Sequence, residues 1–570
     1  MENCNCNHGN VNILTRRAFL DRSFKLGLGV ALSTLVDIPL VVKRALAEGN
    51  IGVPGPNGKT KKLLFIFLRG ANDGLNSVVP ILDPSYAAVR PNIAIPADAG
   101  TDYSAAGYCD FAASGAGPTF GYANAIRLGN GFAALHPSLK FLAPVYNAGD
   151  LALVHRVGYP KQSRSHFDSQ NYWENGNPNN NLSKDGIFYR TMIESGLATG
   201  TNAAALTGVS IQSSLPLILR GSKAAMTNLT DPTRYNLLGI PNTTQGNAKA
   251  DAAIQAANGF PFAEKMNREL LNLQYKNMTD TLSIFASLNF SDSGNTFQDD
   301  GKTDGDDSWV PPTGTGGDSA KGYFLFPTSN DKNGGWRRSA TVTDAQKYVV
   351  DTNAYGFFNN LKAAAIILNK TDAIVAGTEI GGFDTHSNQV SAADSALGAH
   401  ANLQRRIAWS IYALRKYFTQ YADKADWSNI VVVTLSEFGR TTVENADLGT
   451  DHAEAGVMFI AGGVVKGFGK GNPTGVFGCH PSDAVRWVTG PANQTGGVDG
   501  SMFGVSDRYL KRAYDYRSVL GRLIRDHLGA TQNQLNRIVP GYADTTRERL
   551  QAGGLCTLDN TYIMGEPNIV

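Results

Sequence analysis

The feature that most constrains the fold of this chain is an alternation of short apolar runs with amphipathic stretches. The apolar runs have the length of strands and cover residues 61–68, 151–157, 373–376, 430–435 and 457–460. Residues 355–368 and 403–418 instead place apolar side chains on one face of a helix. Strands separated by helices favour a mainly parallel sheet covered on both faces. We therefore predict an α/β fold, a three-layer sandwich with a mainly parallel central sheet.

Composition narrows the class of protein further. Apolar residues make up 42% and charged residues 18% of the 570 residues, which excludes a membrane bundle and a disordered chain. The length fits one large α/β domain, predicted over residues 48–545, followed by a carboxyl-terminal tail at 546–570. Residues 291–336 are rich in Gly, Asp, Asn and Ser and predict an exposed insertion. The net charge of +2 predicts no nucleic-acid partner.

The first 47 residues have the form of an export signal. Arg16 and Arg17 precede a mostly apolar run at 26–42, and residues 45–47 (Ala-Leu-Ala) form a small-x-small cleavage pattern. Paired arginines before such a run are typical of a bacterial twin-arginine signal, whose partner during export is the twin-arginine translocase. Two glycines, an acid and a proline interrupt the run, which makes it too short for a stable membrane span. We therefore predict a periplasmic or secreted protein without a membrane span in the mature chain.

Removal of the signal changes both the cysteine count and the charge. Cys109, Cys479 and Cys556 remain in an oxidising compartment, where one disulfide plus a free thiol is possible and the pairing stays open. The signal carries six basic and three acidic residues, so the mature chain has a net charge of about −1. Any attraction for an anionic ligand must therefore be local.

Acidic and histidine side chains gather next to the ends of the predicted strands. The candidate metal ligands are Asp73, Asp384, His386, Glu437, Asp451 and His452. Because ligands of parallel sheets bind beyond the carboxyl ends of the strands, we expect these side chains to form one site. Imidazoles combined with carboxylates suit zinc and tolerate manganese or iron. Arg440 lies in the same region, either as a clamp for an anionic substrate or as a partner of Glu437.

Two serines and an arginine follow the run at 151–157. Ser165 and Asp168 resemble a capping box, so Ser165 is predicted to open a helix. A hydroxyl at that position also lies in the positive field of the helix dipole, which favours attack on an anionic ester. Ser163 is the second candidate nucleophile, and Arg164 lies between the two serines. Three other histidines, His136, His155 and His400, fit packing or capping roles.

The order of these motifs is specific as a set. The motifs are FLRGANDGLNSVVP, SRSHFDSQNYW, GGFDTHSNQ, TLSEFGRT and GTDHA, spread over most of residues 60–530. The set resembles an uncharacterised bacterial domain-of-unknown-function family that is related to sulfatases within the alkaline phosphatase superfamily. The resemblance implies an alkaline-phosphatase-like α/β sandwich with a two-metal site at the carboxyl ends of the strands. It also implies a Ser nucleophile at a helix N-terminus, a position that Ser165 fits.

The resemblance also assigns the metal ligands. Asp384, His386 and His452 look like one site, for zinc or manganese. Asp73 matches the acid that follows the first strand. Ser436 and Glu437 stand where the superfamily has Asp and His, which favours magnesium, manganese or calcium as a second ion.

Together these features predict an exported metal-dependent hydrolase of phosphate or sulfate esters. Its substrate would be a small-molecule or glycan anionic ester, attacked by Ser165 while Arg440 or Arg164 steadies the charged oxygens. The alternative is a non-catalytic periplasmic or surface binding protein on the same fold that has lost the second metal.

Overall fold

The chain divides into two units, Met1–Ala47 and Glu48–Val570. The computed structural model describes residues 49–107, 109, 124–198, 206–224, 226–231, 248–249, 252, 256, 280–291, 297–299, 324–333, 349–481, 483, 501–503 and 508–570. The predicted export signal lies outside the described residues, and so does most of the predicted insertion at 291–336. No helix within the described part of the chain is long and apolar enough to cross a membrane.

A nine-stranded sheet forms the core of the second unit. Its strands are, in spatial order, β11 (Val476–Phe477), β5 (Leu151–Gly158), β10 (Gly456–Ala461), β9 (Ile430–Leu435), β1 (Lys62–Leu68), β8 (Val375–Ile380), β6 (Gly208–Ile211) and β7 (Thr227–Leu229), while β12 (Tyr514–Asp515) also pairs with β5. Strand β10 runs antiparallel to β5 and β9, and the other pairs are parallel. The mainly parallel sheet predicted from the apolar runs is confirmed.

The central strands are buried along their whole length, which explains their continuous apolar sequences. Every residue of β1 and of β9 is buried, as expected for parallel strands covered on both faces. Strand β8 begins at Val375 rather than at Ala373, because the amide of Ala373 donates to the hydroxyl of Thr371 in a turn. The apolar runs therefore locate the core strands to within a few residues.

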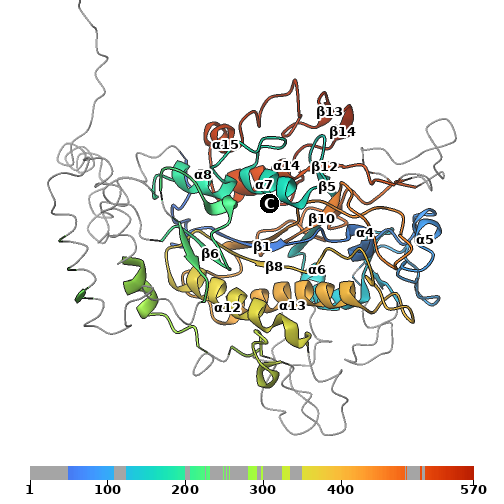
Figure 1. Cartoon of the computed structure of the whole chain (residues 1–570), viewed down its shortest axis with the longest axis horizontal. Helices are drawn as coiled ribbons and strands as arrows, with labels where there is room; N and C mark the ends of the chain where they lie inside the picture. The colour runs from blue at the N-terminus through green and yellow to red at the C-terminus, as the bar shows by residue number, and fades with distance from the viewer. Residues whose placement is uncertain are drawn as a thin grey trace, which may run out of the picture. The chain divides into compact units, whose positions relative to one another are not determined.

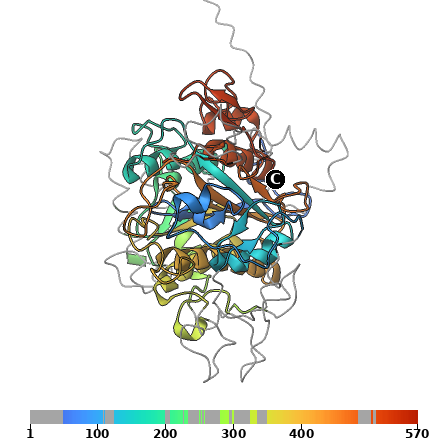
Figure 2. The same ribbon diagram turned by 90° about the vertical axis from the view of Figure 1, so that its right-hand side faces the viewer.

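Helices lie on both sides of this sheet (Figures 1 and 2). On one side are α12 (Tyr355–Lys370) and α13 (Ala399–Gln420), which confirm the helices predicted at 355–368 and 403–418. On the other side are α7 (His166–Asn175), α8 (Ile187–Glu194) and α14 (Tyr516–Arg522). The arrangement is compatible with a three-layer α/β fold.

The carboxyl-terminal residues, predicted as a tail, fold onto the same unit. Strands β13 (Gly554–Cys556) and β14 (Thr561–Ile563) pair antiparallel, Arg525 forms an ion pair with Glu566 at 2.6 Å, and Ile569 is fully buried. Cys109, Cys479 and Cys556 are all buried in the described structure, and Cys479 and Cys556 are free thiols.

Candidate metal centre

Three imidazoles converge on the carboxylate of Asp384. The Nε2 atoms of His452 and His386 lie 3.0 Å and 3.1 Å from Asp384 Oδ1. His166 Nε2 lies 3.3 Å from Asp384 Oδ2, and the Nε2 atoms of His386 and His452 are 2.8 Å apart. The ligand atoms of His166, Asp384 and His452 all lie within 4.8 Å of one another. The structure thus brings together three of the predicted ligands and one histidine that was not predicted.

The sheet topology explains why these side chains meet. Asp384 and His386 follow β8, His166 opens α7 beyond the end of β5, and His452 precedes β10. Because β10 is antiparallel to its neighbours, its beginning lies at the edge where β5 and β8 end. Gly70, after β1, has a φ of +110°, and a Cβ atom there would lie only 2.4 Å from the amide nitrogen of Asp384. Only glycine lets these two loops approach so closely.

Each imidazole is oriented by an oxygen that accepts a hydrogen bond from its Nδ1 atom. The acceptors are Glu437 Oε1 for His166 at 2.8 Å, Asp451 Oδ1 for His386 at 3.1 Å and the carbonyl oxygen of Arg164 for His452 at 2.8 Å. Since these oxygens only accept, each Nδ1 carries a proton, and the Nε2 atoms are the ones that face the carboxylate of Asp384. The Nε2 atoms of His386 and His452 lie 2.8 Å apart, so the pair can share a proton or present two nitrogen atoms to a metal ion.

This arrangement fits a divalent transition metal. Metal-binding imidazoles commonly donate their other nitrogen to a carboxylate or carbonyl, which fixes the ring and makes the ligand more basic. The hydrogen bond to Glu437 raises the pKa of His166 in this way. Burial lowers the pKa of His452, which keeps that imidazole neutral and able to bind a metal.

Asp384 remains a carboxylate in this environment. Partial burial favours its neutral form, but the hydrogen bond and charge of Arg440, together with the nearby imidazoles, outweigh burial and lower the pKa of Asp384 to about 2. The nearest contact is from Arg440 Nη2 to Asp384 Oδ1, at 2.6 Å. The centre therefore combines one negatively charged carboxylate with imidazole nitrogen atoms.

Arg440 positions Asp384 and is not available to clamp a substrate. Its side chain is fully buried. Besides Asp384 its nitrogens donate to four carbonyl oxygens, those of Gly70, Ala71, Phe383 and Thr450. The alternative expectation, a pair with Glu437, is likewise not what the structure shows. A buried guanidinium whose three nitrogen atoms all donate hydrogen bonds within the protein is not accessible to an anionic substrate.

Glu437 orients His166 and lies outside the ligand group. The side chain is fully buried, and Oε1 accepts hydrogen bonds from His166 Nδ1, the amide of Gly70 and Gln170 Nε2. Burial opposes ionisation, but these hydrogen bonds, led by that of His166, lower the pKa of Glu437. Asp451 acts similarly, because it accepts from His386 and forms an ion pair with Arg508 at 2.7 Å.

Asp73 lies apart from the imidazoles. Its oxygens bind the guanidinium of Arg90 at 2.7 and 3.1 Å and accept a hydrogen bond from Gln389 at 2.6 Å. The carboxylate also caps helix α4 (Gly74–Ser77). The structure thus gives this predicted ligand an ion-pairing and capping role.

Ser165 is the N-cap of α7, as predicted, and accepts a hydrogen bond from the amide of Asp168 at 3.4 Å. Its neighbours in the chain on both sides belong to the centre, since the carbonyl of Arg164 holds His452 and His166 contacts Asp384. The hydroxyl of Ser163, the second candidate nucleophile, accepts from the amide of Ser165 at 3.2 Å and so stabilises the turn.

The rim of the centre carries two exposed arginines. The guanidinium of Arg164 lies 4.3 Å from the ring centroid of Tyr509 and contacts its hydroxyl group. Arg508 reaches Asp451 from the same segment. Sequence reasoning missed Arg508 and also His166, although His166 directly follows the proposed nucleophile in a quoted motif. A histidine in the first turn of a helix beyond a strand end was the signal that could have identified it.

The predicted packing and capping histidines are confirmed. His136 accepts the amide of Ser138 at the start of a 3₁₀ helix, and His400 is buried in α13. His155 is buried in β5, and burial lowers its pKa to about 3.

We expect His166→Ala to weaken zinc binding by more than about 100-fold, because the variant lacks one proposed ligand. Glu437→Gln should weaken zinc binding by about 10- to 100-fold, because it removes only the carboxylate that orients His166. Titration of the metal-free protein with zinc measures both effects. The matched control is His480→Ala, which removes a histidine outside the centre. Wild-type zinc affinity in His166→Ala would contradict the assignment.

Asp73→Ala should lower the free energy of unfolding by about 3–5 kcal/mol, because it leaves the buried Arg90 without its partner. The folded fraction should still bind the same number of metal ions per chain. Urea denaturation and elemental analysis measure the two quantities. Loss of metal with unchanged stability would instead make Asp73 a ligand.

Comparison with known proteins adds a family match. Residues 338–479 match a family model described as "Protein of unknown function (DUF1501)". No curated protein and no solved structure matches the chain. The matched region contains Asp384, His386, Glu437, Arg440 and His452, whereas His166 lies outside it. The similarity to a domain-of-unknown-function family expected from the motifs is therefore confirmed for residues 338–479.

Proposed function

We propose that this chain is a metal-dependent hydrolase of phosphate or sulfate esters. The observation that carries the proposal is the convergence of three imidazole Nε2 atoms on Asp384, beside the helix N-terminus that Ser165 caps. Nitrogen and carboxylate ligands together suit zinc or manganese. A divalent ion bound there would polarise the ester and lower the pKa of an attacking hydroxyl.

The proposal needs a single ion. Of the residues expected to serve a second ion of magnesium, manganese or calcium, Asp73 is bound by Arg90 and Glu437 is bound by His166. The Asp73 carboxylate stabilises the fold, and the Glu437 carboxylate orients the imidazole of His166.

Ser165 is the proposed nucleophile. Its Oγ would form a bond to the phosphorus or sulfur atom while the bond to the ester oxygen breaks, and the Ser165 proton would pass to the departing alcohol. A water molecule would then attack the same atom and break its bond to Oγ, which releases phosphate or sulfate, and a proton from that water would restore the Ser165 hydroxyl. Because the mature chain is nearly neutral, the exposed Arg164 and Arg508 would supply the local positive charge that attracts the anion.

The fold and the position of the site support an alkaline-phosphatase-like architecture. The sheet is mainly parallel, the candidate site lies at the carboxyl ends of its strands, and the helix that begins at Ser165 follows strand β5. These are the features that the motif resemblance implies. The one-ion centre with Glu437 in an orienting role is where this chain departs from that pattern.

The rival function is a non-catalytic binding protein on the same fold. The engagement of the Ser165 hydroxyl as a helix cap favours it, because a capping oxygen must give up that hydrogen bond before it attacks. Metal binding without ester hydrolysis would identify this rival.

Activity should require both the metal and Ser165. With 4-nitrophenyl phosphate and 4-nitrophenyl sulfate as substrates, we expect hydrolysis of at least one ester, lost on chelation and restored by zinc or manganese. Ser165→Ala should lower kcat by about 10³-fold or more. Replacement of Ser287, an exposed serine in a turn, by Ala should not change kcat. Inactivity with zinc, manganese, magnesium and calcium, or full activity of Ser165→Ala, would refute the proposal.

We also propose that residues 1–47 direct export by the twin-arginine route to the periplasm or beyond. Replacing Arg16 and Arg17 by Lys should leave the uncleaved precursor in the cytoplasm, because the translocase recognises the pair. Cell fractionation measures the distribution. Arg22→Lys, in the same segment, is the control, and unchanged export of the double variant would refute this route.

A further inference from the structure

A polar groove of about 430 Å³ lies next to the metal centre. It opens at the carboxyl ends of three strands. Arg69 directly follows β1, Gln212 directly follows β6, and Glu379 is the penultimate residue of β8. Helix α7 forms another wall through Gln170 and Glu174. The groove therefore occupies the same edge of the sheet as the centre, on the side toward β6.

The groove and the centre share residues. Gln170 lines the groove and donates from Nε2 to Glu437 Oε1, the same oxygen that accepts from His166. The amide of Gly70, directly after Arg69, also donates to that oxygen. A molecule bound in the groove thus contacts residues that hold Glu437, the carboxylate that orients His166.

The charges that line the groove balance one another. Arg69 forms ion pairs with Glu174 at 2.7 Å and with Glu379 at 2.9 Å. The fourth charged residue, Arg220, is exposed. Two cations and two anions give no net field, so the groove favours a neutral polar ligand over a charged one.

Gln212 provides an independent sign of a ligand. The residue is only 5% exposed, and its Oε1 atom is buried without a hydrogen-bond partner among the described residues. A buried acceptor left without a donor costs free energy, so such atoms call for an explanation. Because Gln212 lines the groove, a rotation of its amide toward the groove would let a bound hydroxyl group donate to this acceptor.

We infer that the groove binds a sugar, as the alcohol part of the ester cleaved at the metal centre; this specificity builds on the proposed hydrolase function. Sugar hydroxyls both donate and accept hydrogen bonds, and they match a lining that mixes carboxylates, guanidinium groups and amides. Leu215 and Leu217 supply apolar surface for the C–H faces of a sugar ring. The substrate class is then a sugar phosphate or a sugar sulfate.

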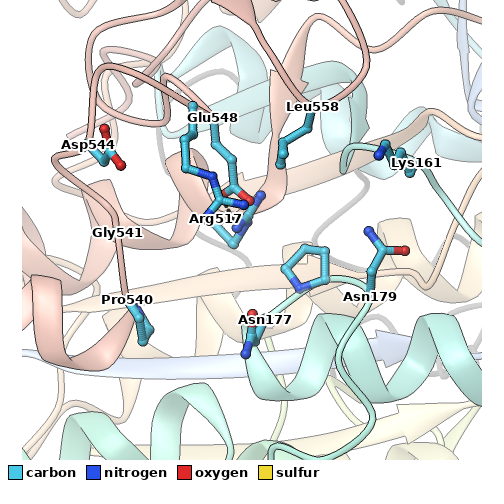
Figure 3. Close-up of a pocket in the computed structure, with 11 residues that line it drawn as sticks. Lys161, Asn177, Asn179, Arg517, Pro540, Gly541, Asp544, Glu548 and Leu558 are labelled. Atoms are coloured by element: carbon cyan, nitrogen blue, oxygen red, sulfur yellow. Dashed lines mark hydrogen bonds and ion pairs between the residues drawn. The ribbon is translucent and has the colours of Figure 1, made fainter.

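A second polar pocket, of about 420 Å³, provides a control within the same chain. Figure 3 shows its lining, in which Asn177 and Asn179 lie opposite Pro540 and Asp544. None of its lining residues carries a buried polar atom without a hydrogen bond. Asn177→Ala therefore removes a polar side chain of similar kind from a pocket to which we assign no ligand.

The test combines sugar binding with substrate preference. Saturation-transfer NMR with methyl β-glucoside and methyl N-acetyl-β-glucosaminide measures binding to the full chain, and cyclohexanol serves as an apolar ring of similar size. Kinetics give the ratio of kcat/KM for glucose 6-phosphate to that for 4-nitrophenyl phosphate. We expect at least one glycoside to bind and Gln212→Ala to lower both its affinity and this ratio by about five- to tenfold. Asn177→Ala should resemble the wild type.

The outcomes separate the two proposals. Ester hydrolysis without glycoside binding, or equal values for Gln212→Ala and the wild type, would overturn the sugar groove while leaving the hydrolase standing. Glycoside binding that depends on Gln212, in a chain that hydrolyses no ester, would support the groove and refute the hydrolase. A circular dichroism spectrum and thermal midpoint equal to those of the wild type show that Gln212→Ala is folded.

Discussion

One buried guanidinium, that of Arg440, holds the loops of the candidate site together. It donates to carbonyl oxygens after β1, after β8 and before β10, and to the carboxylate of Asp384. A buried charge is tolerated only when it is fully paired and hydrogen-bonded. The hydrogen bonds of Arg440 therefore fix the loops that carry Asp384 and His452 relative to each other. The positions of the imidazoles on these loops follow from that arrangement.

A second layer of acceptors converts this geometry into a ligand set. Glu437, Asp451 and the carbonyl of Arg164 each accept a hydrogen bond from an Nδ1–H group, so the three Nε2 atoms face the carboxylate of Asp384. Removing a single acceptor would free one ring to turn or to change tautomer. The same carboxylate of Glu437 connects the centre to Gln170 and hence to the polar groove.

The sequence predicts the strands and much of the centre. It does not predict the residue roles that depend on the burial of a side chain or on the order of strands in the sheet. Apolar runs located β1, β5 and β9 because buried parallel strands leave a continuous signal. Asp384, His386 and His452 were found because they follow or precede such runs. His166 was missed because its position in the first turn of a helix beyond a strand becomes informative only once β5 is known to lie beside β10. Arg440 was expected at the substrate because its complete burial cannot be inferred from composition.

The central claim is that three imidazoles and one carboxylate hold a metal ion. X-ray absorption at the zinc edge of the zinc-loaded chain tests this claim most directly. The account predicts a first shell of nitrogen and oxygen at about 2.0–2.1 Å with the outer scattering of three imidazole rings, reduced to two rings in His166→Ala. A shell of oxygen atoms alone, or a spectrum that is identical in His166→Ala, would contradict it.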